Sequence, residues 1–138
     1  MPNGDCLFCQ IISGEIPATK VYEDDKILAI LDIHPVNPGH TLVMPKKHFT
    51  HLLETDEETA TAMILATKKI ALGVINGLNL DAFNLELNNG RIAGQIVPHL
   101  HWHIVPRMSD DGLQHWPGKS YRAGEAEEIA KKIRENIR

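Results

Sequence analysis

The chain of 138 residues has few aromatic side chains, only two cysteines and no surplus of basic residues. A formal net charge of −4 argues against nucleic-acid binding by broad phosphate neutralisation, although a few donors can still bind a small phosphate compound. The N-terminus lacks a basic signal segment, and no apolar run approaches the length of a membrane span. We therefore expect a cytoplasmic protein with neither a nucleic-acid nor a membrane partner.

The two cysteines, Cys6 and Cys9, are too close in sequence to join distant parts of a fold. In a reducing compartment the C-x-x-C spacing indicates half a metal site or a redox dithiol. Redox dithiols of the thioredoxin type usually lie in a βαβ unit, which the neighbouring residues do not indicate. Half a zinc site is therefore favoured, and two further ligands would come from the eight histidines.

Length and composition are those of one domain over 1–138, with a core over 5–107 and a C-terminal loop and helix over 108–138. A short helical turn is expected over 6–13. Period-2 and turn signals predict strands, the last two forming a hairpin, over 20–23, 26–32, 40–44, 82–88 and 99–105. The fold class is α+β: an antiparallel sheet of about five strands with one long helix and a C-terminal helix.

A capping box from Thr55 to Glu58 is expected to open the long helix over roughly 56–78. Helical spacing predicts a buried stripe of Ala60, Met63, Ile64, Ile70, Ala71 and Val74. In the second helix, near 125–137, the same spacing places three isoleucines on one side: Ile129, Ile133 and Ile137.

Three histidines alternate with apolar residues from His99 to Val105, which is typical of a half-buried strand. The imidazoles of His99, His101 and His103 should therefore share one face. Folding alone gives little reason for such a row of histidines. A solvent-facing strand whose histidines have no function is the alternative interpretation. Residues two apart on a strand are roughly 6.7 Å apart, so one zinc ion could bind at most two neighbours of the three. A metal-dependent hydrolase using part of the row also stays open.

Three segments together resemble the histidine triad (HIT) superfamily of nucleotide hydrolases and transferases. They are Pro38-Gly39-His40 with its following strand, the turn ending in Gly94-Gln95, and the histidine row, which matches the family signature at every position. The segment from Cys6 to Pro17 is also similar to the family's N-terminal region. The resemblance covers residues 5–107.

The resemblance implies covalent catalysis at the α-phosphate of a purine nucleotide. His101 would attack phosphorus and expel the leaving group, and water would then release AMP. His103 would bind a phosphate oxygen, His40 would orient the triad, and Gln95 would border the leaving group. A homodimer is implied as well.

The same resemblance assigns the nucleotide-binding residues. An apolar slot for the base would be formed by Leu7, Phe8, Ile11, Ile30 and Ile33, which on their own are typical of a core. Asp32 would accept hydrogen bonds from the ribose, although a loop cap is the competing interpretation. Asn88, Gly94, Gln95, His101 and His103 would surround the phosphate. The implied structural zinc ligands are Cys6, Cys9, His48 and His99.

Departures from the family pattern leave the substrate open. Ile96 stands where the phosphoramidase branch has a serine that helps to protonate an amine leaving group. Pro98 and Pro106 lie in segments similar to the fragile-histidine branch, whereas His115-Trp116-Pro117-Gly118 is similar to the phosphoramidase tail. Leu100 and Trp102 exclude the transferase branch. We expect hydrolysis of purine nucleoside phosphoramidates or acyl-adenylates; a dinucleoside polyphosphate hydrolase and a non-catalytic nucleotide-binding module are the alternatives.

Overall fold

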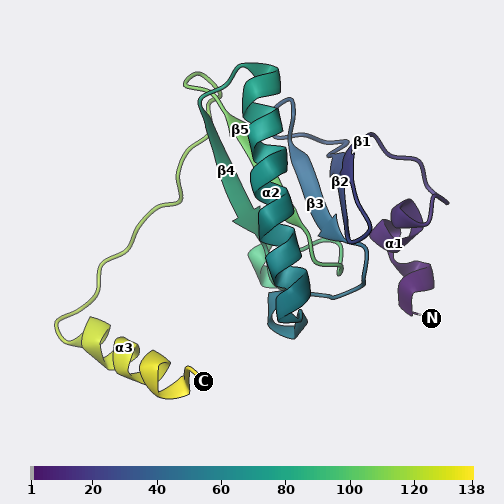
Figure 1. The fold of residues 1–138 in the computed structure, drawn as a ribbon. Coiled ribbons are helices and arrows are strands. Elements are labelled where there is room, and N and C mark those ends of the chain that lie inside the picture. The colour runs from purple at the N-terminus through teal and green to yellow at the C-terminus, as the bar shows by residue number, and fades with distance from the viewer. Residues whose placement is uncertain (1) are drawn as a thin grey trace.

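The computed structural model describes residues 2–138 and contains a five-stranded antiparallel sheet with a long helix across one face (Figure 1). The strands are β1 (Lys20–Glu23), β2 (Ile27–Leu31), β3 (Thr41–Pro45), β4 (Ala82–Leu87) and β5 (Trp102–Arg107). Their order in the sheet is β1-β2-β3-β5-β4, so β4 and β5 pair as expected and β1 and β4 are the edges. The predicted α+β class is confirmed.

Helix α1 (Leu7–Ile12) covers one end of the sheet, α2 (Glu57–Leu78) crosses the opposite face, and α3 (Glu125–Asn136) is near the C-terminus. Short 3-10 turns occupy Pro2–Asp5, Leu52–Glu54 and Arg91–Ala93. By length and composition α2 alone among the described residues could cross a membrane. A core helix meets the same test, and one face of α2 packs on the sheet.

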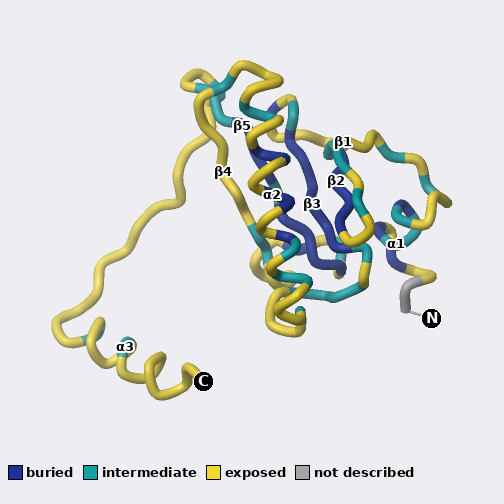
Figure 2. The backbone as a smooth tube through the Cα atoms, viewed as in Figure 1, coloured by how far each residue is buried: buried dark blue, intermediate teal, exposed yellow. Residues whose placement is uncertain are grey.

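The central strands β2, β3 and β5 are mostly buried (Figure 2). Alternation of the side chains along them divides the core into two layers. Ile27, Ala29, Val43, Trp102 and Ile104 face α2 and contact its buried residues, including Met63, Ala66 and Ile70. Leu28, Ile30, Leu42 and Met44 face the other way and contact Phe8 and Ile11 of α1. Because α1 is short, it leaves part of this second face accessible.

The structure corrects three local predictions. The N-cap of α2 is Asp56, whose Oδ1 accepts a hydrogen bond from the Thr59 amide at 2.8 Å, rather than Thr55. Thr55 instead donates its hydroxyl to the carbonyl oxygen of His51. Ile64 was predicted to be buried but is 47% exposed, because it lies outside the contact stripe of α2.

The last strand begins later than predicted, at Trp102 rather than His99. The amide of His99 donates to the carbonyl of Val97, and the amide of Leu100 donates to the carbonyl of Phe49. These backbone groups therefore bond to loops instead of to a neighbouring strand.

The C-terminal helix lies apart from the sheet (Figure 1). An extended segment after Arg107 leads to it, and Ile129, Ile133 and Ile137 are 36%, 56% and 71% exposed. The predicted apolar side exists, but within residues 2–138 no other element packs against it. β4 is similarly exposed along most of its length (Figure 2).

Candidate active site and metal centre

The histidine row keeps its alternation although only part of it is strand. His99, His101 and His103 all lie on the α1 side of the sheet, and Phe8 of α1 is edge-on to two of them, with ring centroids 5.9 Å from His99 and 4.9 Å from His101. Trp102 and Ile104 point into the α2 layer. The three imidazoles have different partners, which gives each of them different chemistry.

His101 has the protonation state that a nucleophile needs. Its Nδ1 lies 2.8 Å from the carbonyl oxygen of His99, which can only accept, so Nδ1 carries the proton and Nε2 keeps its lone pair. The side chain is buried, and burial lowers the pKa of the imidazole. His101 therefore stays neutral at pH values below those at which an exposed histidine would take up a proton.

His103 and His40 form a pair whose proton positions follow from the backbone. The amide of Val36 donates to Nδ1 of His40 at 3.1 Å, so the proton of neutral His40 is on Nε2. That Nε2 lies 2.9 Å from Nδ1 of His103 and donates to it. The proton of His103 is therefore on Nε2, which leaves a donor for a phosphate oxygen.

Burial controls the charge of this pair. It lowers the pKa of His103 to about 4, assisted by the neighbouring imidazoles of His101 and His40. Burial also lowers the pKa of His40, although the negative charges of Asp32 and Glu86 act to raise it. The site is thus built from neutral imidazoles at physiological pH.

A pocket of about 360 Å³ lies between α1, β2 and the histidines. Nine of the eleven predicted nucleotide-binding residues line it: Leu7, Phe8, Ile11, Ile30, Asp32, Ile33, Gly94, His101 and His103. Asp32 acts as the loop cap considered from the sequence, since one carboxylate oxygen accepts from the His34 amide at 2.8 Å. Its other carboxylate oxygen lies 3.7 Å from Nε2 of His40. A larger cavity of about 530 Å³, between α2 and β1, lies on the opposite face.

Gln95 and Asn88 do not line the pocket. Gln95 is buried, and its amide nitrogen donates to the carbonyls of Thr50 and Val97 at 2.6 and 3.2 Å. Its Oε1 accepts from the Gly90 amide at 2.8 Å. This side chain therefore holds two loops together rather than facing a leaving group.

Sequence reasoning missed several wall residues of the pocket. Leu42 could have been found, because it pairs with His103 of β5 and so lies on the same face of the sheet. Nothing in the sequence indicated that Ile16, Ala18 and Val97 would close the apolar end.

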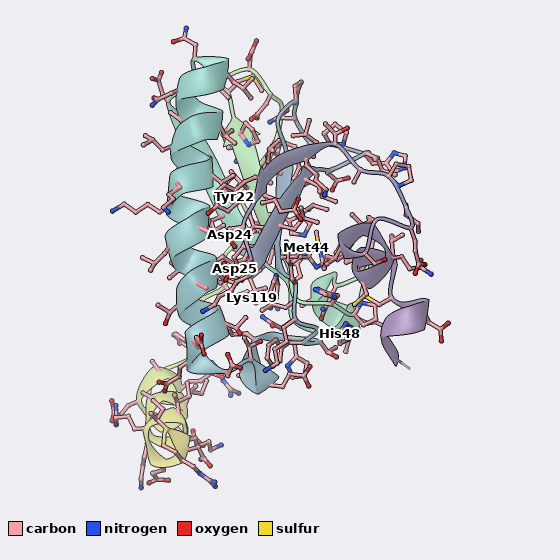
Figure 3. All side chains as sticks on the ribbon, turned by 45° about the vertical axis from the view of Figure 1, so that its right-hand side comes forward. Tyr22, Asp24, Asp25, Met44, His48 and Lys119 are labelled. Atoms are coloured by element: carbon pink, nitrogen blue, oxygen red, sulfur yellow. The ribbon has the colours of Figure 1, made fainter. Side chains whose placement is uncertain are left out.

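A second cluster joins α1 to the start of the histidine row (Figure 3 labels His48, beside α1). Its four side chains, Cys6, Cys9, His48 and His99, bring their ligand atoms within 4.8 Å of one another. Nδ1 of His99 lies 3.1 Å from Nδ1 of His48, 3.4 Å from Sγ of Cys6 and 3.5 Å from Sγ of Cys9. Nε2 of His99 donates to the carbonyl of Pro45 at 2.8 Å, so Nδ1 presents a lone pair.

These distances fit one tetrahedral zinc ion. Zn–N bonds of about 2.0–2.1 Å and Zn–S bonds of about 2.3 Å place two nitrogens about 3.4 Å apart, and nitrogen and sulfur about 3.6 Å apart. Both cysteines are free thiols. Asp32, His40 and His103 also gather within 4.8 Å, but His40 and His103 use their facing nitrogens to bond each other.

Fold and site together define an antiparallel α+β protein with a neutral histidine in a pocket of about 360 Å³, next to a Cys₂His₂ cluster. The family model described as "HIT domain" matches residues 13–110. The chain belongs to the HIT family, whose members include nucleotide-binding proteins and hydrolases.

Individual relatives agree with this assignment. A protein of Arabidopsis thaliana named adenylylsulfatase HINT3 is 43% identical over 120 residues, which are 87% of this chain and 60% of that protein. A crystal structure of a HIT family member from Bacillus subtilis, 38% identical, superposes with a TM-score of 0.90 over 97% of this chain and 98% of that chain. A zinc-bound histidine triad family protein of Mycobacterium smegmatis, also 38% identical, gives 0.77 over 94% and 99%.

Proposed function

We propose that the protein hydrolyses purine nucleoside phosphoramidates or acyl-adenylates at the α-phosphate and releases AMP. The observation that carries the proposal is the bare Nε2 of His101 in a pocket with room for a nucleoside. Nε2 would form a bond to phosphorus while the bond to the leaving group breaks with its electron pair. Water would then attack phosphorus, the N–P bond would break, and AMP would leave.

The remaining side chains support positioning and charge stabilisation, which carry most of the catalysis in phosphoryl-type transfers. The protonated Nε2 of His103 would donate to a phosphate oxygen, held in place by His40. Leu7, Phe8, Ile11, Ile30 and Ile33 would contain the base. The free oxygen lone pairs of Asp32 would accept from the ribose hydroxyls.

One observation favours a second candidate, a dinucleoside polyphosphate hydrolase. Ile96 is 91% exposed at the pocket wall and has no proton to give an amine leaving group. A phosphate leaving group needs no such proton near neutral pH. Turnover of an AMP amidate and of diadenosine tetraphosphate by the same preparation separates the two. Failure on the amidate and on an acyl-adenylate, with turnover of the tetraphosphate, would overturn our first choice.

We also propose that the Cys₂His₂ cluster holds a structural zinc ion. When bound, zinc would cross-link α1, which forms one wall of the nucleotide pocket, to the residues before β5. The cluster geometry and the zinc-bound relative support this assignment. Free thiols suit a reducing compartment, and we propose the cytoplasm, to be checked by cell fractionation.

Homodimerisation is the last part of the proposal. Phe83 and Leu85 are 41% and 42% exposed on the edge strand β4, and α3 presents its isoleucines to solvent. The TM-score of 0.90 also requires the C-terminal segment of the B. subtilis protein to take the same path. A C-terminal helix that does not pack on the rest of the described chain suits contact with a second copy. Sedimentation equilibrium should give twice the chain mass for the wild type and less for Leu85→Lys; a monomeric wild type would contradict it.

A further inference from the structure

The two cysteines of the proposed zinc cluster lie on either side of the first turn of α1. Cys6 is the N-cap of the helix, and its Sγ accepts a hydrogen bond from the backbone amide of Cys9 at 3.4 Å. The ligand atoms of the cluster lie within 4.8 Å of one another, and a disulfide bond is about 2.05 Å long. The two sulfur atoms therefore need to approach each other by less than about 3 Å to form an intramolecular disulfide.

A disulfide and a zinc site cannot use these sulfur atoms at the same time. Zinc is bound by thiolates, and oxidation to a disulfide removes the negative charge from both sulfurs. Only the imidazoles of His48 and His99 would then remain as ligands, which is half of a closed tetrahedral site. Formation of the disulfide therefore requires release of the ion.

The accessible member of the pair is Cys9. Its side chain is half-buried and lines a surface groove of about 330 Å³ next to Gln10, Ser13 and Lys46. Cys6 is 6% exposed, so its sulfur can reach Cys9 but not a cysteine of another chain. The sequence contains no further cysteine. A small oxidant such as hydrogen peroxide would therefore react first at Cys9, and Cys6 would complete the reaction.

The segment between the cysteines belongs to the nucleotide pocket. Leu7 and Phe8 are the two residues between them, and both line the pocket. Phe8 is edge-on to His99 of the zinc cluster and to His101 of the pocket, with ring centroids 5.9 and 4.9 Å away. A disulfide that shortens this turn of α1 and releases His99 would therefore move the wall against which a base is expected to bind.

We propose that Cys6 and Cys9 are a reversible oxidation site, at which a hydroperoxide forms a disulfide, releases the zinc ion and weakens nucleotide binding. This inference rests on the zinc site and the nucleotide pocket of the proposed function and adds control by oxidants to them. The Cys9 thiolate attacks one peroxide oxygen, the O–O bond breaks, and a sulfenic acid and hydroxide form. The Cys6 thiolate then attacks the Cys9 sulfur, and hydroxide leaves as the disulfide forms. The two thiolates lose two electrons in total, and the peroxide is reduced to two water molecules with two protons from solvent.

The test treats the zinc-loaded wild type with hydrogen peroxide and follows zinc release to a chromogenic chelator, the intact mass of the chain, and the Kd of AMP by calorimetry. Zinc release and disulfide formation should have the same rate, and the disulfide lowers the mass of the reduced chain by about 2 Da. The Kd should rise about three- to tenfold, which is the effect of losing one edge-on aromatic contact. Dithiothreitol followed by zinc should restore the initial mass and Kd.

Cys9→His is the matched variant, because an imidazole can replace a thiolate as a zinc ligand but cannot form a disulfide. The peroxide dose that releases zinc from the wild type should change neither the zinc content of this variant nor its own Kd. The variant keeps all four methionines, so it also controls for their oxidation. The wild-type time course decides the question even where the variant does not fold.

Three results would overturn the inference: a disulfide that forms while zinc stays bound, zinc release without a disulfide, or an unchanged Kd in the oxidised wild type. Freshly purified wild type without zinc would overturn the proposed zinc site and this inference together. Failure to hydrolyse any nucleotide, with zinc release, mass and Kd responding as expected, would overturn the proposed activity alone.

Discussion

The main-chain oxygen of His99 accepts the hydrogen bond that fixes the Nδ1 proton of His101, at 2.8 Å. The imidazole of the same His99 lies within 3.5 Å of Cys6 and Cys9. One residue thus belongs to the metal cluster through its side chain and to the candidate active site through its backbone. Displacement of His99 should therefore disturb both sites.

His101→Ala should lower turnover of an AMP amidate on the order of 10³-fold or more, because it removes the lone pair of Nε2 that is proposed to attack phosphorus. Intact-mass spectrometry after rapid quenching should show a nucleotidyl adduct on the wild type and none on the variant. His51→Ala removes a histidine outside the pocket and should keep the adduct. An adduct that persists in His101→Ala would assign the nucleophile to another residue.

Removal of the metal should loosen α1. Metal analysis should find about one zinc per chain, and Cys9→Ser should bring this close to zero. Loss of a metal cross-link worth about 3 kcal/mol would lower Tm by about 10 °C for a chain of this size. Ser13→Ala, at the exposed end of α1, is the control and should keep both zinc and Tm. A Tm insensitive to chelation would argue against a structural role.

Stability should fall as the solution is acidified. The pKa of His103 is about 4 in the folded chain against 6.5 ordinarily, so between these values the unfolded state binds more protons. The free energy of unfolding should therefore be independent of this group above pH 6.5 and should decline toward pH 4. His103→Asn should flatten that slope in urea titrations. An unchanged slope would mean that other groups cause the acid sensitivity.

Gln95→Ala should act on stability rather than on chemistry. The substitution removes three hydrogen bonds and leaves the backbone groups of Thr50, Val97 and Gly90 without their partner. The free energy of unfolding should fall by about 1–3 kcal/mol. Urea unfolding measures this cost, and kcat for an AMP amidate should stay within a few-fold of wild type at low temperature. A large loss of kcat without loss of stability would instead support a direct role at the leaving group.

Sequence periodicity predicted the elements well where one face of each is buried. The alternation in β2, β3 and the histidine row and the 3.6-residue stripe of α2 reflect burial directly. Sequence patterns failed where hydrogen bonds determine the end of an element. The amides of His99 and Leu100 donate to loop carbonyls, so β5 starts later than predicted. Asp56 rather than Thr55 forms the N-cap of α2. An amphipathic pattern also cannot identify the surface that covers it, as α3 shows.

The candidate site divides in the same way. The C-x-x-C pair and the three histidines are visible as motifs, and the structure brings the four expected ligands together. The orientation of the Gln95 amide depends on side-chain torsion angles, which no pattern encodes. Glu86 was invisible for another reason: its position beside His103 exists only through the register of β4 on β5.

The distance along the chain between Cys6 and His99, 93 residues, has a consequence for biosynthesis. The helix that carries the thiols leaves the ribosome well before its partner on the other side of the cluster, which is synthesised 93 residues later. Until then the two thiols lack their His99 partner, and α1 can pack only against β2 and β3. The cluster can therefore close only after residue 99 has left the ribosome, and chaperone capture should be stronger for released fragments ending before residue 99 than for released fragments ending after residue 107.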